Sequence, residues 1–142
     1  MSKALEAQAT IDAPVGVVWS ALTDWDNAHR WMAGVDSMTA DGGVEVGTKL
    51  TFRARGKDRP SEIAQLEPGR SVTLRSVQGG VVADYTYELT PINDHATRAS
   101  LVAECSTSGL LWNLAGPVLR FAMRRTDGGQ IDALKKVVED RR

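Results

Sequence analysis

The sequence predicts an α+β fold in which a curved antiparallel sheet of about six or seven strands wraps around a long C-terminal helix. Three observations support this fold class. Between residues 34 and 105, apolar and polar residues alternate with the period of strands. Short turn motifs separate the alternating segments, as in an antiparallel meander. From residue 109 onward, apolar residues recur at helical spacing, so this last segment is expected to cover the apolar face of the sheet.

The first thirty residues predict one strand followed by two short helices. Residues 5–11 alternate as a half-buried strand does, and Pro14 suits the first turn of a helix. One apolar helical face follows at spacing i, i+3, i+4, i+7, formed by Val15, Val18, Trp19 and Leu22. Asp24 is a good N-cap for a second helix that runs to Trp31.

The central part of the chain predicts a meander. The expected strands cover residues 35–40, 49–55, 61–66, 72–75, 83–90 and 98–105. The expected turns cover residues 41–43, 56–60, 67–70, 79–80 and 91–95, and all of them are rich in Gly, Pro, Asp or Asn. Each strand has one apolar and one polar face, so one side of the sheet is covered and the other meets water.

The C-terminal segment, residues 109–142, predicts a helix throughout. Its apolar positions are Leu111, Leu114, Ala115, Val118, Ala122, Ile131, Leu134 and Val138. Gly116-Pro117 can kink this helix, and Asp127-Gly128-Gly129 weakens it, because each Gly costs about 1 kcal/mol relative to Ala.

Composition narrows the class of protein. The chain has 142 residues, a net charge of -1, one cysteine and two histidines. These numbers predict a single domain over residues 1–142, with no internal disulfide, no metal site and no nucleic-acid partner. The N-terminus has no apolar leader, and charged residues interrupt every apolar segment. We therefore expect a cytoplasmic protein without integral membrane association, monomeric or homodimeric, that needs no cofactor.

A motif near the N-terminus carries a family resemblance. It consists of Ile11-Asp12-Ala13-Pro14, Val18-Trp19, Leu22, Asp24 and Trp31. With Glu67-Pro68-Gly69-Arg70, Thr97-Arg98 and the terminal helix, it resembles the START-like (SRPBCC) superfamily, in its polyketide cyclase/dehydrase and lipid-transport branch. The resemblance implies a helix-grip fold, with a cavity between sheet and helix. It does not fix the activity, since this superfamily includes binders, transporters and enzymes.

Small residues on the predicted concave face support a cavity independently. Ala54, Ala83, Ala99 and Ala103 stand where a sheet packed tightly on a helix would more often use Val, Ile or Leu. At about 24 cal/mol per Å³, an empty pocket of roughly 300 Å³ would cost about 7 kcal/mol. Either the helix settles closer to the alanines, or water or a ligand fills the space.

The tryptophans have different expected roles. Trp19 is expected in the core, and Trp25 at the surface or between helices. Trp31 either borders the mouth of the cavity, where the resemblance places it, or plugs the core.

The remaining candidate ligand-binding residues come from several elements. Met32 and Met38 suit a permissive apolar site, because Met side chains are adaptable. Tyr85 and Tyr87 either anchor polar groups of a ligand or reach solvent at the end of the sheet. The other candidates are Phe52, Leu101 and Ala103 on the strands, and Leu111, Trp112, Ala115 and Leu119 on the terminal helix. The helix residues form either the wall of the site or ordinary packing.

Few residues suggest catalysis. His29 and His95 are expected in solvent, and Arg53 and Glu104 on the outer face, although a register slip of one residue would turn both inward. The sequence contains no nucleophile triad, phosphate loop or dinucleotide fingerprint.

Three functions remain open at this point. The first is a protein that binds a small hydrophobic molecule of lipid, polyketide or quinone type. The second is a cyclase, aromatase or dehydratase without a metal or nucleotide cofactor, in which Tyr85, Tyr87 and Arg53 would act. The third is a protein-interaction module, which would expose a large apolar patch.

Overall fold

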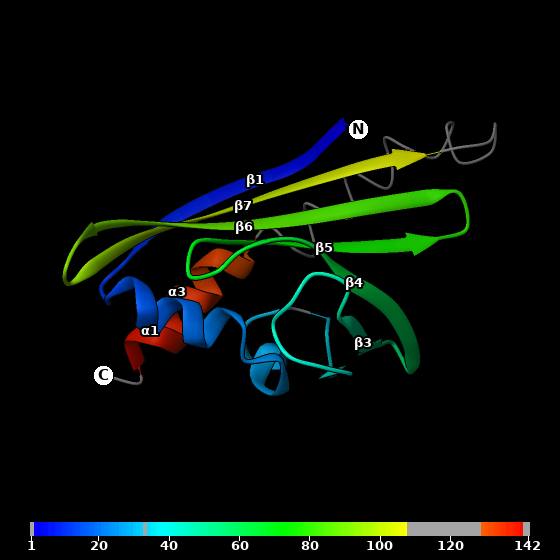
Figure 1. Ribbon diagram of the computed structural model, residues 1–142, viewed down its shortest axis with the longest axis horizontal. Coiled ribbons are helices and arrows are strands. Elements are labelled where there is room, and N and C mark those ends of the chain that lie inside the picture. The colour runs from blue at the N-terminus through cyan, green and yellow to red at the C-terminus, as the bar shows by residue number, and fades with distance from the viewer. Residues whose placement is uncertain (1, 33, 108–128, 141–142) are drawn as a thin grey trace.

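The computed structural model describes residues 2–32, 34–107 and 129–140, which form a seven-stranded antiparallel sheet and three helices on one side of it (Figure 1). The strands are β1 (Ser2–Ile11), β2 (Ser37–Ala40), β3 (Lys49–Ala54), β4 (Lys57–Glu67), β5 (Ser71–Gln78), β6 (Val81–Asn93) and β7 (Ala96–Thr107). Their order in the sheet is β1-β7-β6-β5-β4-β3-β2. The predicted α+β class and the predicted meander are therefore confirmed.

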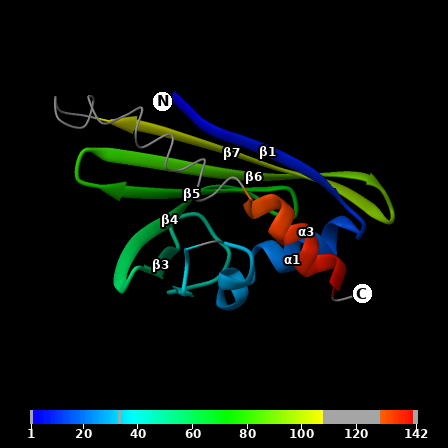
Figure 2. The same ribbon diagram turned by 180° about the vertical axis from the view of Figure 1, so that it is seen from behind.

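The helices lie together beneath the curved sheet. They are α1 (Val15–Leu22), the 3-10 helix η1 (Trp25–Arg30) and α3 (Gln130–Asp140). Figures 1 and 2 show α1 and α3 under the part of the sheet nearest the β6–β7 turn, while β4 and β3 bend down toward the level of η1. α3 packs on β1 and α1, which confirms a C-terminal helix against the sheet. Of the helix predicted over residues 109–142, the part over residues 109–128 lies outside the described residues, and Gln130–Asp140 form α3.

Two turns form as the sequence predicts. At Glu67-Pro68-Gly69-Arg70, the Arg70 N–H donates to the Glu67 carbonyl oxygen at 2.9 Å, and Gly69 has a φ of 78°. Pro at the second position and a positive φ at the third are the features of a type II turn. Gly79 and Gly80 form the two-residue β5–β6 hairpin, with Gln78 opposite Val81.

Two other turns are shorter than predicted. The turn expected over residues 56–60 contains only Arg55 and Gly56, which have φ values of 53° and 76°, and β4 begins directly after them. The turn expected over residues 91–95 is also shorter, because β6 continues to Asn93. Pro60 is a residue of β4 and Pro91 is a residue of β6. At these positions β4 pairs only with β3 and β6 pairs only with β7, because the pairing of either strand with β5 does not extend that far. A missing N–H is tolerated there.

A network of hydrogen bonds holds α3 to β1. The Lys135 ammonium donates to the Thr10 carbonyl oxygen at 2.7 Å, and the Asp12 N–H donates to the Glu139 carboxylate at 2.9 Å. Lys135 and Glu139 also pair with each other at 2.7 Å. The hydrogen bond from Lys135, and next the one from Asp12, lower the pKa of the Glu139 carboxyl from its ordinary value.

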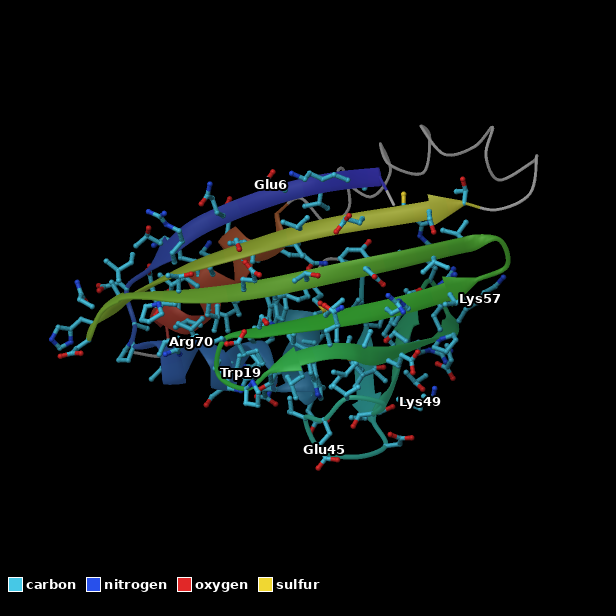
Figure 3. All side chains as sticks on the ribbon, turned by 45° about the horizontal axis from the view of Figure 1, so that its top comes forward. Glu6, Trp19, Glu45, Lys49, Lys57 and Arg70 are labelled. Carbon is cyan, nitrogen blue, oxygen red and sulfur yellow. The ribbon has the colours of Figure 1, made fainter. Side chains whose placement is uncertain are left out.

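The outer face of the sheet carries a row of charges across six strands. In register order the row is Lys3, Glu104, Asp84, Arg75, Glu62 and Lys49. Arg75 pairs with Asp84 through two bonds of 2.8 Å. Figure 3 shows polar side chains over this face, including Glu6 on β1. A slip of one residue would move the whole row inside, so the charges and the apolar inner face specify the same register. Glu104 therefore lies on the outer face, as predicted.

Candidate functional site

The candidate site lies on the inner face of the sheet, at the middle of β5, β6, β7 and β1. Two cross-strand rows meet here. One row is Leu74, Tyr85, Ala103 and Leu5; the next is Val72, Tyr87, Leu101 and Ala7. Leu101 and Ala103 are fully buried, and Tyr85 is half-buried. The alternation of each strand places these residues on one face, as the sequence predicted.

Trp31 comes from the helix side of the fold and packs against the inner face of the sheet. It follows η1 directly and is 3% exposed. Its ring meets that of Tyr87 edge to face, with centroids 5.6 Å apart and planes at 90°. Such a geometry is favoured by the quadrupoles of the two rings. Trp31 is thus part of the core cluster, which is one of the two alternatives predicted for it.

Gln130 joins the same group from the start of α3. The Tyr87 hydroxyl donates to the Gln130 side-chain oxygen at 2.6 Å, and Gln130 is 4% exposed. This bond ties the sheet to the first residue of the helix and fixes the Tyr87 hydroxyl in the interior. The Tyr87 hydroxyl does not reach solvent, which was the alternative that the sequence left open.

The other described candidates lie at the neighbouring edge of the sheet. Met38 on β2 stands opposite Phe52 on β3, and η1 packs on β2 beside them. Met32 and Met38 are buried and Phe52 is half-buried. Together with Trp31, these residues extend the apolar inner face from β6 to the far edge of the sheet.

Several candidates are not brought into this group. Leu111, Trp112, Ala115 and Leu119 lie outside the described residues. Arg53 lies on the outer face, where its guanidinium pairs with Asp58 at 3.1 Å. His29 and His95 are exposed, as predicted.

The sequence reasoning missed two polar residues of the interior. Arg59 stands opposite Phe52 in the pairing of β3 with β4 and is half-buried, but it was assigned to a turn. Its alternation with Ser61 and Ile63 was the signal that could have placed it on the inner face. Gln130 precedes Leu134 and Val138 at helical spacing, which was the signal for its apolar surroundings.

Two indole nitrogens are buried without a protein partner among the described residues. They are Nε1 of Trp25 and Nε1 of Trp31, at the two ends of η1. Trp25 is 7% exposed and belongs to the core cluster, so of its two expected positions the surface is excluded and a packing position on η1 remains. Buried polar groups without a partner are rare in folded proteins.

Two other features are absent from the described part of the chain. Within it, no three His, Cys, Asp or Glu side chains gather as metal ligands would. Among the same residues, no helix is long and apolar enough to cross a membrane.

The curved sheet, the two short helices after β1 and the C-terminal helix define a START-like, helix-grip protein. Residues 3–139 match the family described as polyketide cyclase / dehydrase and lipid transport, so the chain belongs to that family. A search of curated proteins gave no match.

Solved structures of the same fold are similar over nearly the whole chain. The Zhui aromatase/cyclase from Streptomyces sp. R1128 is 18% identical, with a TM-score of 0.74 and coverage of 96% of this chain and 93% of the other. Norcoclaurine synthase from Thalictrum flavum, in complex with dopamine and hydroxybenzaldehyde, is 14% identical, with a TM-score of 0.65 and coverage of 97% and 87%. A START superfamily protein from Mycobacterium smegmatis is 12% identical, with a TM-score of 0.68 and coverage of 97% and 98%. At these identities the likeness establishes the fold.

Proposed function

We propose that this protein binds a small hydrophobic molecule against the inner face of the sheet. The molecule would lie between strands β5, β6 and β7 on one side and Trp31 on the other. The observation that carries the proposal is the composition of this face. It combines alanines at buried positions with aromatic rings, and Tyr85 and Phe52 remain half-buried. An apolar surface with a few placed polar groups is the usual lining of a small-molecule site.

The alanines distinguish this face from ordinary core packing. Ala99 and Ala103 are fully buried on β7, while Ala83 on β6 and Ala54 on β3 are half-buried. Ala99, Ala103 and Ala83 stand opposite Leu89, Tyr85 and Cys105, and Ala54 lies two residues after Phe52 on β3. All four alanines therefore lie on the inner face. Small side chains leave room for a ligand above the sheet, whereas branched ones would fill it.

The family supports the same reading. Its description joins polyketide cyclases, dehydrases and lipid transport, and lipids are apolar molecules. The norcoclaurine synthase structure holds dopamine and hydroxybenzaldehyde, and the Zhui protein is an aromatase/cyclase. A lipid, polyketide or quinone type of ligand is consistent with these relatives.

An enzyme of cyclase or aromatase type is the second candidate. The observation in its favour is the meeting of Tyr87, Gln130 and Trp31, since polar groups that converge in an apolar site can orient a reacting chain. Arg53 plays no part in this candidate, because it lies on the outer face. An interaction module finds no support, since the exposed large apolar residues of the described chain, Val17, Val46, Val77 and Ile92, come from separate elements.

The direct test is to look for bound ligand and to fill the site. Native mass spectrometry of the purified protein, followed by solvent extraction, should reveal a bound small molecule, and Nile red should bind saturably. Ala103→Leu adds bulk to the inner face and should weaken Nile red binding by about tenfold. Val102→Leu, one residue away on the outer face of β7, is the matched control and should bind as the parent does.

The proposal fails if the parent protein carries no small molecule and Nile red does not saturate. It also fails if Ala103→Leu and Val102→Leu have the same affinity as the parent while both remain folded by circular dichroism.

A further inference from the structure

The Trp31 indole N–H is a hydrogen-bond donor that the described protein does not use. Trp31 is 3% exposed, and its Nε1 has no partner among the described residues. An indole nitrogen can only donate, so an acceptor has to come to it. Leaving such a donor unpaired in the interior costs free energy, and most native proteins avoid that cost.

The neighbouring donor is already engaged. The Tyr87 hydroxyl, whose ring touches that of Trp31, donates its hydrogen to Gln130 at 2.6 Å. The short distance and the burial of both groups hold this bond in place. Of the two rings in contact, Trp31 is therefore the one whose donor has no acceptor among the described residues.

We infer, resting on the proposed function, that Trp31 donates a hydrogen bond to a carbonyl oxygen of the bound molecule, and that the site prefers a ring ketone over a hydrocarbon of the same shape. A neutral carbonyl matches a neutral indole donor, since burying an anion in this apolar setting would cost far more. The aromatic walls provided by Trp31 and Tyr87 suit a flat ligand. Trp31 is then a specificity residue, because a site that pairs with a polar group disfavours the analogue that lacks it.

Trp25 offers an internal comparison. It lies at the other end of η1, is 7% exposed, and also has an indole nitrogen without a partner among the described residues. No ring contact links it to Tyr87, whereas Trp31 has one. A change at Trp25 therefore reproduces the loss of a buried indole N–H without removing the ring contact with Tyr87.

The test uses 9-fluorenone and fluorene, which have the same ring frame and differ by the carbonyl oxygen. The measured quantity is the ratio of their dissociation constants. Replacement of Trp31 by 3-benzothienylalanine keeps the shape of the side chain and substitutes sulfur for N–H. We expect this replacement to reduce the preference for fluorenone by about five- to tenfold, the usual worth of one hydrogen bond. The same replacement at Trp25 should leave the ratio unchanged.

A second readout follows the N–H group itself. The chain has four tryptophans, so a ¹⁵N spectrum of labelled indoles is simple, and Trp31→Phe assigns the Trp31 signal by its loss. Fluorenone should shift the Trp31 indole proton downfield, as a new hydrogen bond does, and fluorene should not.

The outcomes separate the two proposals. If neither compound binds while Nile red does, the inference is overturned and hydrophobic binding stands; if Nile red does not bind either, both the proposed function and this inference are overturned. If both bind but the ratio is the same in the parent and the Trp31 variant, and the indole proton does not respond to fluorenone, hydrophobic binding stands and the inference is wrong.

Discussion

The two ends of the inner face are packed in different ways. The packed end, near the β6–β7 turn, is formed by large aliphatic side chains that are at most 1% exposed: Ile11, Val18, Leu22, Leu134 and Val138. The aromatic end, toward the β5–β6 hairpin, contains Phe52, Ala83 and Tyr85, all half-buried. α3 lies under the packed end (Figure 2).

We propose that this difference separates the part of the molecule that holds the fold from the part that binds the ligand. Branched aliphatic residues from β1, α1 and α3 fill the packed end and leave little room there. Trp31, Tyr87 and Gln130 lie between the two ends and connect them. Changes at the packed end should therefore alter the free energy of unfolding, and changes at the aromatic end should alter affinity.

The largest expected effect comes from truncation at the packed end. Leu134→Ala removes a fully buried side chain of α3 and should lower the free energy of unfolding by about 2–5 kcal/mol, from lost burial and the cavity left behind. Urea denaturation measures it. Nile red affinity, measured where the variant is still folded, should stay close to that of the parent. A loss below about 1 kcal/mol, or a large change in affinity, would contradict the division between the two ends.

A smaller effect is expected from one buried hydrogen bond at the packed end. The Thr97 hydroxyl donates to the Ala13 carbonyl oxygen at 2.9 Å, and Thr97 is fully buried. Thr97→Val keeps the shape and removes this bond, so it should cost about 1–2 kcal/mol in thermal denaturation. Thr90→Val, at an exposed position on β6, is the control and should cost close to nothing. Equal losses in the two variants would show that the buried bond contributes no stability.

The smallest effect is the acid dependence of the contact between α3 and β1. The pKa of Glu139 is lowered in the folded protein, first by the hydrogen bond from Lys135 and then by that from Asp12. A carboxyl with a lowered pKa stabilises the fold above its unfolded pKa, and this contribution is lost as the pH falls through the folded pKa. An NMR titration of Glu139 should therefore have a midpoint below the ordinary value for Glu.

Lys135→Met tests the cause of that shift. It removes the strongest contact of Glu139 and should raise the midpoint of its titration. A midpoint that does not move would mean that Lys135 is not what holds the carboxylate.

Most of the fold could be predicted from the sequence because each strand alternates cleanly. Residues such as Leu101 and Ala103 on β7 have their positions set by that alternation alone, and the neighbouring pair of Glu104 with Asp84 on the outer face agrees with it. The predicted boundaries were wrong at Pro60 and Pro91, because proline was taken to end a strand. Whether a strand has a partner on both sides at such a position is a property of the sheet, and the local sequence does not contain it.

The candidate site was harder to predict than the fold. Trp31 and Tyr87 were among the candidates, but their contact depends on how η1 packs across from β6. The bond from Tyr87 to Gln130 joins residues that are 43 positions apart, and nothing in either segment points to the other. The lack of a partner at Trp31 Nε1 is likewise visible only once all neighbours are in place.

The most direct test of the central claim is a crystal structure with 2-bromo-9-fluorenone, whose bromine gives an anomalous signal. The account predicts an anomalous peak on the inner face of the sheet beside Tyr85 and Tyr87, with the ketone oxygen about 3 Å from Trp31 Nε1. A ligand bound only on the outer face, among the charges of Arg75 and Asp84, or no ordered ligand at a saturating concentration, would contradict it.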